Sequence, residues 1–319
     1  MSIFDDDEPD LETLAARLAD NDPAVRRIAV LALADTADPD AVDLLAGMLA
    51  DSDTDVRKAA AEALQSFDGA AAARGLLAAM RDTSEAVREA ALAALMETRA
   101  ADAGPVLLGC AADPDPAVRA AALSGLRELR LPASLLPALQ GAEHGDARVR
   151  RAAIGVLGYL RDPDAVPALI SAVADPEPAV RRAAVSALSA VEQSDAAQAM
   201  EAALSDAHWQ VREEAAEAIG KRRLAQGLTG LISAMQDEYW QVRVKAACSL
   251  GRLGDMRALP ALGSALGHPV SNLRKEAAAA LGEIRHPNAL PHLRQAVTDP
   301  DPDVRKLARW AIERIEAAA

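Results

Sequence analysis

The stretch PDAVPALISAVADPEPAVRRAAVSAL, residues 163–188, contains every element of a pattern that runs through the whole chain. An apolar run leads to a turn at Asp175, and a Val-Arg pair at Val180–Arg181 follows six residues later. The arginine of that pair recurs every 31 residues without an insertion. Ten occurrences in one phase indicate a repeat protein. The ten arginines are Arg26, Arg57, Arg88, Arg119, Arg150, Arg181, Arg212, Arg243, Arg274 and Arg305.

The residues that follow each arginine predict an amphipathic helix. Valine precedes the arginine in nine units and Leu273 in the other, and Leu or Ile stands seven residues after it. Offsets of −1, +3 and +7 lie on one face of a helix. An alanine at +3 in every unit marks a close approach between helices: Ala29, Ala60, Ala91, Ala122, Ala153, Ala184, Ala215, Ala246, Ala277 and Ala308.

A second helix is predicted before each of these, because apolar residues recur twelve and eight positions before the arginine, as at Leu45 and Leu49. Each unit is then a helical hairpin that must stack on its neighbours. The expected fold is all-α, an α-solenoid with a right-handed superhelix of ten 31-residue hairpins. We expect an acidic N-terminal tail over 1–7 and one solenoid over 8–317. Its predicted repeats are 8–38, 39–69, 70–100, 101–131, 132–162, 163–193, 194–224, 225–255, 256–286 and 287–317.

An acidic position lies six residues before the repeated arginine. Aspartate occupies it in eight units, and His144 and His268 replace it in the other two. Aspartate at a helix start accepts backbone N–H bonds, and it can also meet an arginine of the same or an adjacent unit. We therefore predict an Asp–Arg ladder along the stack. Its members are Asp20, Arg26, Asp51, Arg57, Asp82, Arg88, Asp113, Arg119, Asp175, Arg181, Asp206, Arg212, Asp237, Arg243, Asp299 and Arg305.

This arrangement resembles the HEAT repeat, in which a proline of the first helix is followed by an aspartate at the turn and then by Val-Arg. Pro105, Pro167, Pro260 and Pro291 occupy the proline position, whereas other units carry residues such as Asp43 there. The short period is similar to that of the bacterial HEAT-like class named after phycobilisome lyases. That resemblance implies either a scaffold or a subunit that handles a tetrapyrrole. The His-Glu pairs of the iron-binding deoxyhypusine hydroxylases are absent from this sequence.

Composition narrows the classes of partner. The 319-residue chain has a net charge of −14 and contains 2% aromatic residues. A strongly acidic protein repels phosphate backbones and anionic lipids, so nucleic acid and membranes are disfavoured and a basic protein is favoured. Two cysteines, Cys110 and Cys248, do not form a disulfide framework, and no signal peptide or long apolar run occurs. We expect a monomer in the cytoplasm.

No catalytic or metal-binding motif is found, and the residues themselves imply no cofactor. The five histidines show no i,i+4 spacing and no adjacent cysteine, so no metal site is expected. No phosphate loop or nucleophile elbow occurs. The two interpretations of Cys248 are a small buried side chain and a thiol for attaching a cofactor.

Aromatic residues gather in the seventh and eighth units. Trp209 and Trp240 share one phase, three residues before the arginine, and we expect them about 10 Å apart on neighbouring repeats. They are either a binding platform or rings that cover the turn of the next unit. The candidate binding residues around them are His208, Trp209, Gln210, Glu213, Glu217, Tyr239, Trp240 and Gln241. Arg148, Arg151 and Arg182 are basic candidates in the fifth and sixth units.

Two functions follow from these patterns. The favoured one is a non-enzymatic scaffold or adaptor that holds a protein partner on the concave surface lined by the second helices. The alternative, which comes from the family resemblance, is a lyase or chaperone subunit for a bilin or another tetrapyrrole. No catalytic residue is predicted in either case.

Overall fold

The computed structural model describes residues 10–36, 38–191 and 194–317, which form twenty α-helices and no strand. The all-α solenoid prediction is confirmed. The first helices of the hairpins are α1 (Leu11–Arg17), α3 (Ala41–Met48), α5 (Ala70–Ala79), α7 (Gly104–Cys110), α9 (Leu135–Ala142), α11 (Val166–Ala172), α13 (Ser194–Ala202), α15 (Leu228–Ala234), α17 (Leu259–Ala265) and α19 (Leu290–Ala296). The second helices are α2 (Pro23–Thr36), α4 (Thr54–Ala63), α6 (Glu85–Met96), α8 (Pro116–Leu129), α10 (Ala147–Leu160), α12 (Pro178–Leu188), α14 (Trp209–Arg222), α16 (Trp240–Leu253), α18 (Ser271–Ile284) and α20 (Pro302–Glu316).

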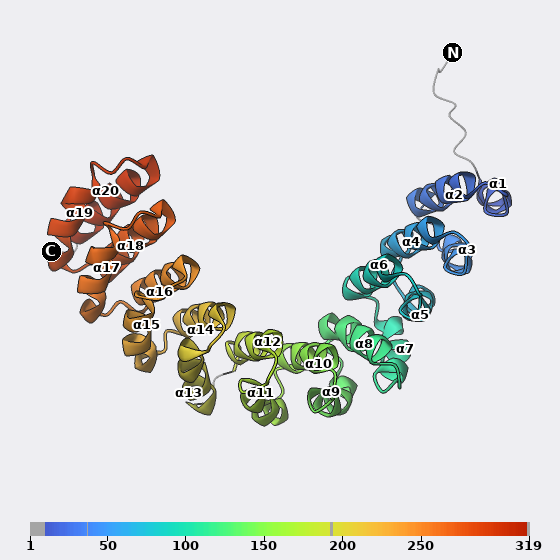
Figure 1. Cartoon of the computed structure of the whole chain (residues 1–319), viewed down its shortest axis with the longest axis horizontal. Helices are drawn as coiled ribbons and strands as arrows, with labels where there is room; N and C mark the ends of the chain where they lie inside the picture. Colours follow the sequence, from blue (N-terminus) through green and yellow to red (C-terminus); the bar gives the residue numbers. More distant parts are fainter. Residues whose placement is uncertain (1–9, 37, 192–193, 318–319) are drawn as a thin grey trace, which may run out of the picture. The chain divides into compact units, whose positions relative to one another are not determined.

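The chain divides into two compact units, residues 1–162 and 163–319. The division falls between the fifth and sixth predicted repeats. Within each unit the even-numbered helices pack in chain order as one layer and the odd-numbered helices form a second layer (Figure 1). The predicted repeat boundaries, the single solenoid over 8–317 and the handedness of the superhelix stay predictions. The predicted acidic tail, residues 1–7, lies outside the described residues.

The core lies between the two layers of each unit, and the repeated alanine occupies its tightest position. All ten alanines at +3 have an exposed fraction of 0%. The apolar residues at −1 and +7 are buried as well, except Val25 and Ile312, which are partly exposed. Those two belong to the first and last hairpins, each of which packs against one neighbouring hairpin of its own unit. Burial of one apolar face per helix is the main stabilising contribution in such a stack.

Five of the connections from one hairpin to the next contain a left-handed residue. Arg130, Arg161, Arg223 and Arg285 have φ between 49° and 54°, and Gly254 has φ 73°. This residue ends the second helix of its hairpin, and a short 3₁₀ turn then leads into the first helix of the next one. Among the helices of the described residues, none is both long and apolar enough to cross a membrane.

Candidate partner-binding surface

Five of the ladder arginines each join two successive turns. The Arg26 guanidinium donates Nη1 to the carbonyl of Asp20 at 2.8 Å. Its Nε and Nη2 donate to the two carboxylate oxygens of Asp51, both at 2.7 Å. The arginine therefore pairs with the aspartate of the following hairpin. The same pairing occurs at 2.6–2.8 Å in Arg57–Asp82, Arg181–Asp206, Arg212–Asp237 and Arg274–Asp299.

The ladder aspartate also shapes the turn that precedes the second helix. Asp51 accepts the backbone N–H of Asp53 at 2.8 Å, and Asp53, not Asp51, is the N-cap of α4. The N-cap role that the sequence suggested for Asp51 thus belongs to Asp53, two residues further along the chain. The hydrogen bond from Arg26 holds the pKa of Asp51 below its usual value, although burial opposes that shift.

Four ladder positions depart from this pairing. Arg88 donates to the carbonyls of Asp82 and Thr83, because Asp113 accepts Arg81 at 2.5 Å instead. Arg119 precedes the hairpin in which His144 replaces the ladder aspartate, and it donates Nη2 to the carbonyl of Ala112. The last arginine donates Nη1 to carbonyls of its own turn.

The fourth departure is the rung of Arg243 and His268. Arg243 Nη1 lies 3.0 Å from His268 Nε2. Arg243 also donates Nε to the carbonyl of Asp237. His268 is therefore in contact with the ladder arginine, although the sequence has no aspartate at this ladder position.

The aromatic residues of the second unit form what we call the aromatic edge, defined as Trp209, Tyr239 and Trp240. Trp209 begins α14 and Trp240 begins α16, with Tyr239 as the N-cap of α16. The Trp209 and Tyr239 rings stack with centroids 5.3 Å apart and planes at 14°. Trp209 thus stacks on a turn residue of the next hairpin, as the structural interpretation expected. The ring pair that the structure brings together is Trp209–Tyr239 rather than Trp209–Trp240.

Exposure distinguishes the three rings. Trp209 is partly buried, whereas Tyr239 and Trp240 are each 39% exposed. The Arg212 guanidinium lies 5.8 Å from the centroid of the Tyr239 ring and pairs with Asp237 at 2.6 Å. The stacked tryptophan and the paired arginine therefore hold Tyr239 in place while part of its surface remains exposed.

The polar candidates beside the aromatic edge are of two kinds. His208 Nδ1 and Gln241 Oε1 are buried and form no hydrogen bond within the described residues, and Gln210 is partly buried. Glu238 is 74% exposed and lies 3.6 Å from Arg212. An exposed acidic group therefore directly precedes Tyr239 in the chain.

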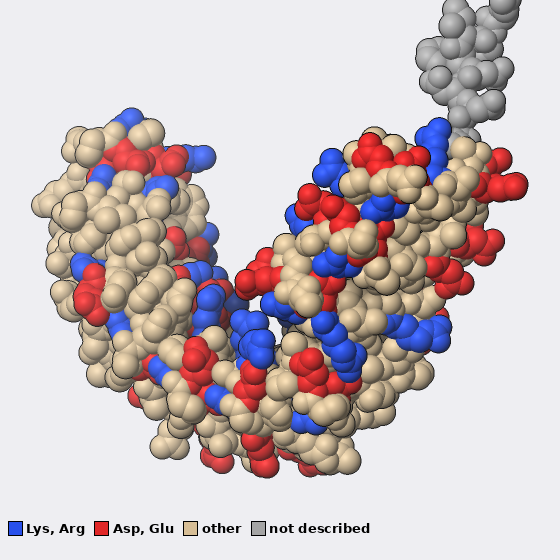
Figure 2. Space-filling view, turned by 45° about the vertical axis from the view of Figure 1, so that its right-hand side comes forward, with Lys and Arg blue, Asp and Glu red and all other residues tan. Residues whose placement is uncertain are grey.

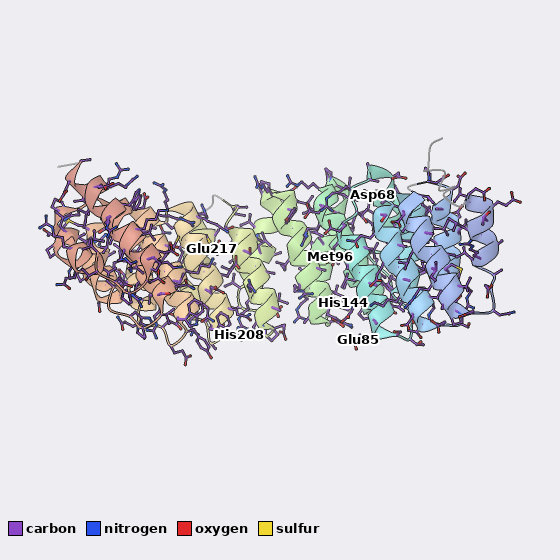
Figure 3. All side chains as sticks on the ribbon, turned by 90° about the horizontal axis from the view of Figure 1, so that it is seen from above. Asp68, Glu85, Met96, His144, His208 and Glu217 are labelled. Carbon is purple, nitrogen blue, oxygen red and sulfur yellow. The ribbon has the colours of Figure 1, made fainter. Side chains whose placement is uncertain are left out.

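Glu213 and Glu217 lie on α14, and Glu217 joins α14 to α16. Glu217 accepts Lys221 at 2.8 Å and Lys245 at 2.6 Å, and these bonds lower its pKa to about 2. The pKa of Lys245 is raised chiefly by its bond to Glu217 and also by the charge of Glu213. Figure 3 shows His208 near one edge of the second unit and Glu217 further across the helical layer. Glu217 thus has two basic neighbours and is not an unneutralised acidic group.

The basic candidates also have acidic neighbours. Arg148 and Arg151 of α10 line a groove of about 180 Å³ in the first unit, and Glu85 and Glu89 of α6 line it as well. Arg148 pairs with Asp146 at 2.6 Å. In the second unit, Arg182 pairs with Glu214 at 3.3 Å. Figure 2 shows basic and acidic side chains interspersed on the visible face of the first unit. A purely basic stretch is therefore absent from this groove.

Cys248 lines a cavity of about 410 Å³ between α16 and α18. Burial, followed by the negative charge of Glu276, raises the pKa of its thiol to about 11. A thiol with such a pKa is protonated at neutral pH and reacts slowly as a nucleophile. Across the described part of the chain, no group of three or more His, Cys, Asp or Glu side chains is arranged to hold a metal ion.

The sequence matches the model of a known protein family along most of its length. The model described as HEAT repeats matches residues 11–96, 73–140, 135–220 and 228–313. This chain belongs to the HEAT-repeat family. The narrower resemblance to the phycobilisome-lyase class stays a prediction. No curated protein sequence matches the HEAT-repeat chain.

Solved structures with the same fold include an engineered protein, Kap95p and the YibA protein of E. coli. The engineered protein has a TM-score of 0.52 at 20% identity, with 96% of this chain and 98% of that chain covered. Kap95p, which is yeast importin-β, has a TM-score of 0.63 at 16% identity, with 97% and 50% covered. YibA has a TM-score of 0.58 at 20% identity, with 90% and 96% covered. This HEAT-repeat chain thus spans about half the length of Kap95p, and at these identities the likeness shows the fold alone.

Proposed function

We propose that this chain is a non-enzymatic scaffold that binds a protein partner at the aromatic edge of its second unit. The observation that carries the proposal is the exposure of Tyr239 and Trp240, at 39% each, with the Tyr239 ring held by Trp209 and Arg212. Large aromatic rings contribute much of the energy of protein interfaces, and rings already held in place lose little conformational entropy on binding. Such rings are suited to serve as anchors.

The charge around the rings supports a partner with a basic or neutral surface. Glu238 is exposed beside Arg212, and the whole chain has a net charge of −14. Long-range repulsion disfavours strongly acidic partners. The solved Kap95p structures include one that concerns its binding to RanGDP and one of a complex with Nup1, so a protein of this fold binds protein partners.

Attachment of a tetrapyrrole gains no support from Cys248. A covalent bond to a bilin requires a reactive thiol, and the pKa of about 11 keeps this thiol protonated. Cys248 therefore does not favour the tetrapyrrole function, and we propose the scaffold.

The test compares wild-type chain with a Trp209→Ala, Tyr239→Ala, Trp240→Ala triple variant as baits in extracts of the native host. Proteins captured only by wild type are purified, and their affinities for both baits are measured directly. We expect the triple variant to lose about 30-fold or more in affinity, which corresponds to about 2 kcal/mol. Circular dichroism should show an unchanged helical content.

The matched control removes exposed apolar side chains elsewhere. Leu136 is 63% exposed and Met256 is 53% exposed. A Leu136→Ala, Met256→Ala variant should bind with the wild-type affinity. Equal affinity of the aromatic triple variant and the wild type for every captured protein would contradict the proposal.

A further inference from the structure

The rung of Arg243 and His268 contains a conflict between hydrogen-bond donors. His268 Nδ1 lies 3.1 Å from the backbone nitrogen of Val270, which can only donate. His268 Nε2 lies 3.0 Å from Arg243 Nη1, which also can only donate. A neutral imidazole has one acceptor nitrogen and one N–H, and a charged one has two N–H groups. In every protonation state, at least one of these contacts therefore sets two donors against each other.

The other turn histidines favour the arrangement with the acceptor at Nδ1. His144 and His286 also accept a backbone N–H at Nδ1, from Asp146 at 3.0 Å and from Asn288 at 3.2 Å. In the rungs built on aspartate, a carboxylate oxygen accepts this same turn bond. With Nδ1 as the acceptor, the proton of His268 lies on Nε2 and faces Arg243. What the rung lacks is an acceptor between these two groups.

The charge of the rung shows the same deficit. Arg212 and Arg274, on either side of Arg243, each donate to both oxygens of a carboxylate. Arg243 instead contacts the carbonyls of Asp237 and Glu238 and the imidazole, and its Nη2 contact with Glu238 is a long 3.5 Å. Burial and then the charge of Arg243 lower the pKa of His268, which favours the neutral ring. At the position that Asp237 and Asp299 occupy in the adjacent rungs, this rung has the imidazole in place of a carboxylate.

A cavity lies beside this Arg243–His268 pair. It has a volume of about 250 Å³ and is lined by Arg243 and His268 together with Ser264 and Gln236. Such a volume admits a carboxylate group, and all four side chains can donate hydrogen bonds. The aromatic edge is close by, since Trp240 and Arg243 are three residues apart on α16 and neighbours on its surface.

We infer that this cavity binds a carboxylate of the partner protein, from an aspartate or glutamate that docks beside Trp240. One carboxylate oxygen accepts from Arg243 Nη1 and from the Nε2–H of His268, and so replaces the contact between two donors with two charge-assisted hydrogen bonds. The inference rests on the proposed function, because the partner must lie on the aromatic edge for its carboxylate to enter. The partner surface is basic or neutral overall, with one acidic residue at this point.

The other histidine rung shows a related deficit in the first unit. Arg119 has no aspartate at the ladder position of the following turn, where His144 stands, and its Nε is buried with no acceptor among the described residues. Replacement of the ladder aspartate by histidine therefore leaves an arginine donor without an acceptor in both units. Because the same deficit occurs in both histidine rungs, the histidine at the ladder position explains the unsatisfied arginine donor.

The first experiment tests the site without the partner. Nitrogen-15 NMR of the imidazoles in the full chain, at neutral pH, is followed during addition of sodium acetate, inorganic phosphate or sodium chloride at constant ionic strength. We expect the Nε2–H tautomer of His268 and a saturable shift of its signals with acetate. His286, with the same Nδ1 bond, is the internal control and should not shift. In the wild-type chain, acetate should also shift the side-chain signals of Arg243. A His268→Asp variant supplies the missing carboxylate itself, so acetate should no longer shift the Arg243 signals in that variant.

An Nδ1–H tautomer, the absence of a saturable acetate shift, or an equal Arg243 shift in His268→Asp would each overturn the inference. Saturation by phosphate with no response to acetate would assign the cavity to free phosphate and overturn the partner carboxylate.

The second experiment uses a purified partner, once captured. Arg243→Gln and His268→Asp should each weaken its binding about tenfold, whereas unchanged affinity would overturn the inference. Failure of the proposed function is distinguishable, because the acetate result does not depend on the aromatic rings.

Discussion

A ladder arginine combines two interactions that the sequence could not separate. The 31-residue period places Arg26 six residues after Asp20 and 25 residues before Asp51, and either aspartate was a possible partner. The structure shows that Arg26 bonds the carbonyl of Asp20 and the carboxylate of Asp51. The arginine therefore links successive hairpins, which explains its presence in every unit. Asp113 pairs with Arg81 and not with the ladder arginine Arg88. This pairing could not be predicted, because it depends on which of the two side chains reaches the carboxylate.

The ladder should make the stability of the chain sensitive to acid. Bonds to Arg26, Arg57 and Arg274 hold the pKa values of Asp51, Asp82 and Asp299 below 3.8 in the folded chain. Their contribution is full well above pH 3.8 and is lost as the pH falls through the unfolded value toward the folded one. We expect the free energy of unfolding in urea to change little from pH 7 to 5 and to fall steeply from pH 5 to 3.

Asp51→Asn provides the control for this pH dependence. It keeps an acceptor for the turn but removes the charge, so it should reduce the free energy of unfolding by about 2 kcal/mol at pH 7. The difference from wild type should shrink as the pH falls, because wild-type Asp51 becomes protonated as well. A difference that stays constant from pH 7 to 3 would show that the carboxylate charge of Asp51 contributes nothing.

The second helix of each hairpin is the element that the sequence predicted best. Its buried face follows from the offsets −1, +3 and +7, and the +3 alanines are completely buried. Its ends were less predictable. The left-handed residue that ends α8, α10, α14 and α18 is an arginine, where glycine is the common choice and α16 uses Gly254. Arginine residues give no sequence signal for this conformation.

Enlarging the repeated alanine should disrupt stacking. Ala91 and Ala93 lie on the same helix, α6, with Ala91 at 0% exposure and Ala93 exposed. We expect Ala91→Leu to lower the free energy of unfolding by about 1–3 kcal/mol, because a larger side chain has no space there. Ala93→Leu should change it by less than about 0.5 kcal/mol. Urea denaturation of both variants measures the difference, and equal effects would refute close packing at Ala91.

The left-handed helix ends make opposite predictions for two substitutions. Arg285 has φ 53° and should favour glycine, so Arg285→Gly should raise the free energy of unfolding by about 0.5–1 kcal/mol. Gly254 has φ 73° and enough open space beside its Cα for a methyl group, so Gly254→Ala should lower it by about 1 kcal/mol through the backbone alone. Thermal unfolding followed by circular dichroism would reveal both changes. Shifts of the same sign in the two variants would be inconsistent with backbone strain.

At the scale of the whole molecule, the repeat pattern determined the hairpins but only part of the candidate surface. Trp209 and Trp240 share a phase, which suggested that they act as a pair. The structure stacks Trp209 on Tyr239, the N-cap residue of α16, and the phase alone gave no sign of this contact. Likewise, Arg148 and Arg151 were basic candidates, whereas Glu85 and Glu89, two hairpins earlier, line the same groove. Contacts between hairpins cannot be predicted from the period alone.

The most direct test of the scaffold proposal places a photo-crosslinking amino acid, p-benzoylphenylalanine, at Trp240 in the full chain in its native host. The aromatic side chain suits this exposed position, and the same residue at Leu136, which is 63% exposed, is the control. Irradiation should yield a discrete crosslinked protein from position 240 that is absent from position 136. The yield should fall when Tyr239→Ala is added. Identical crosslinking patterns from the two positions would contradict partner binding at the aromatic edge.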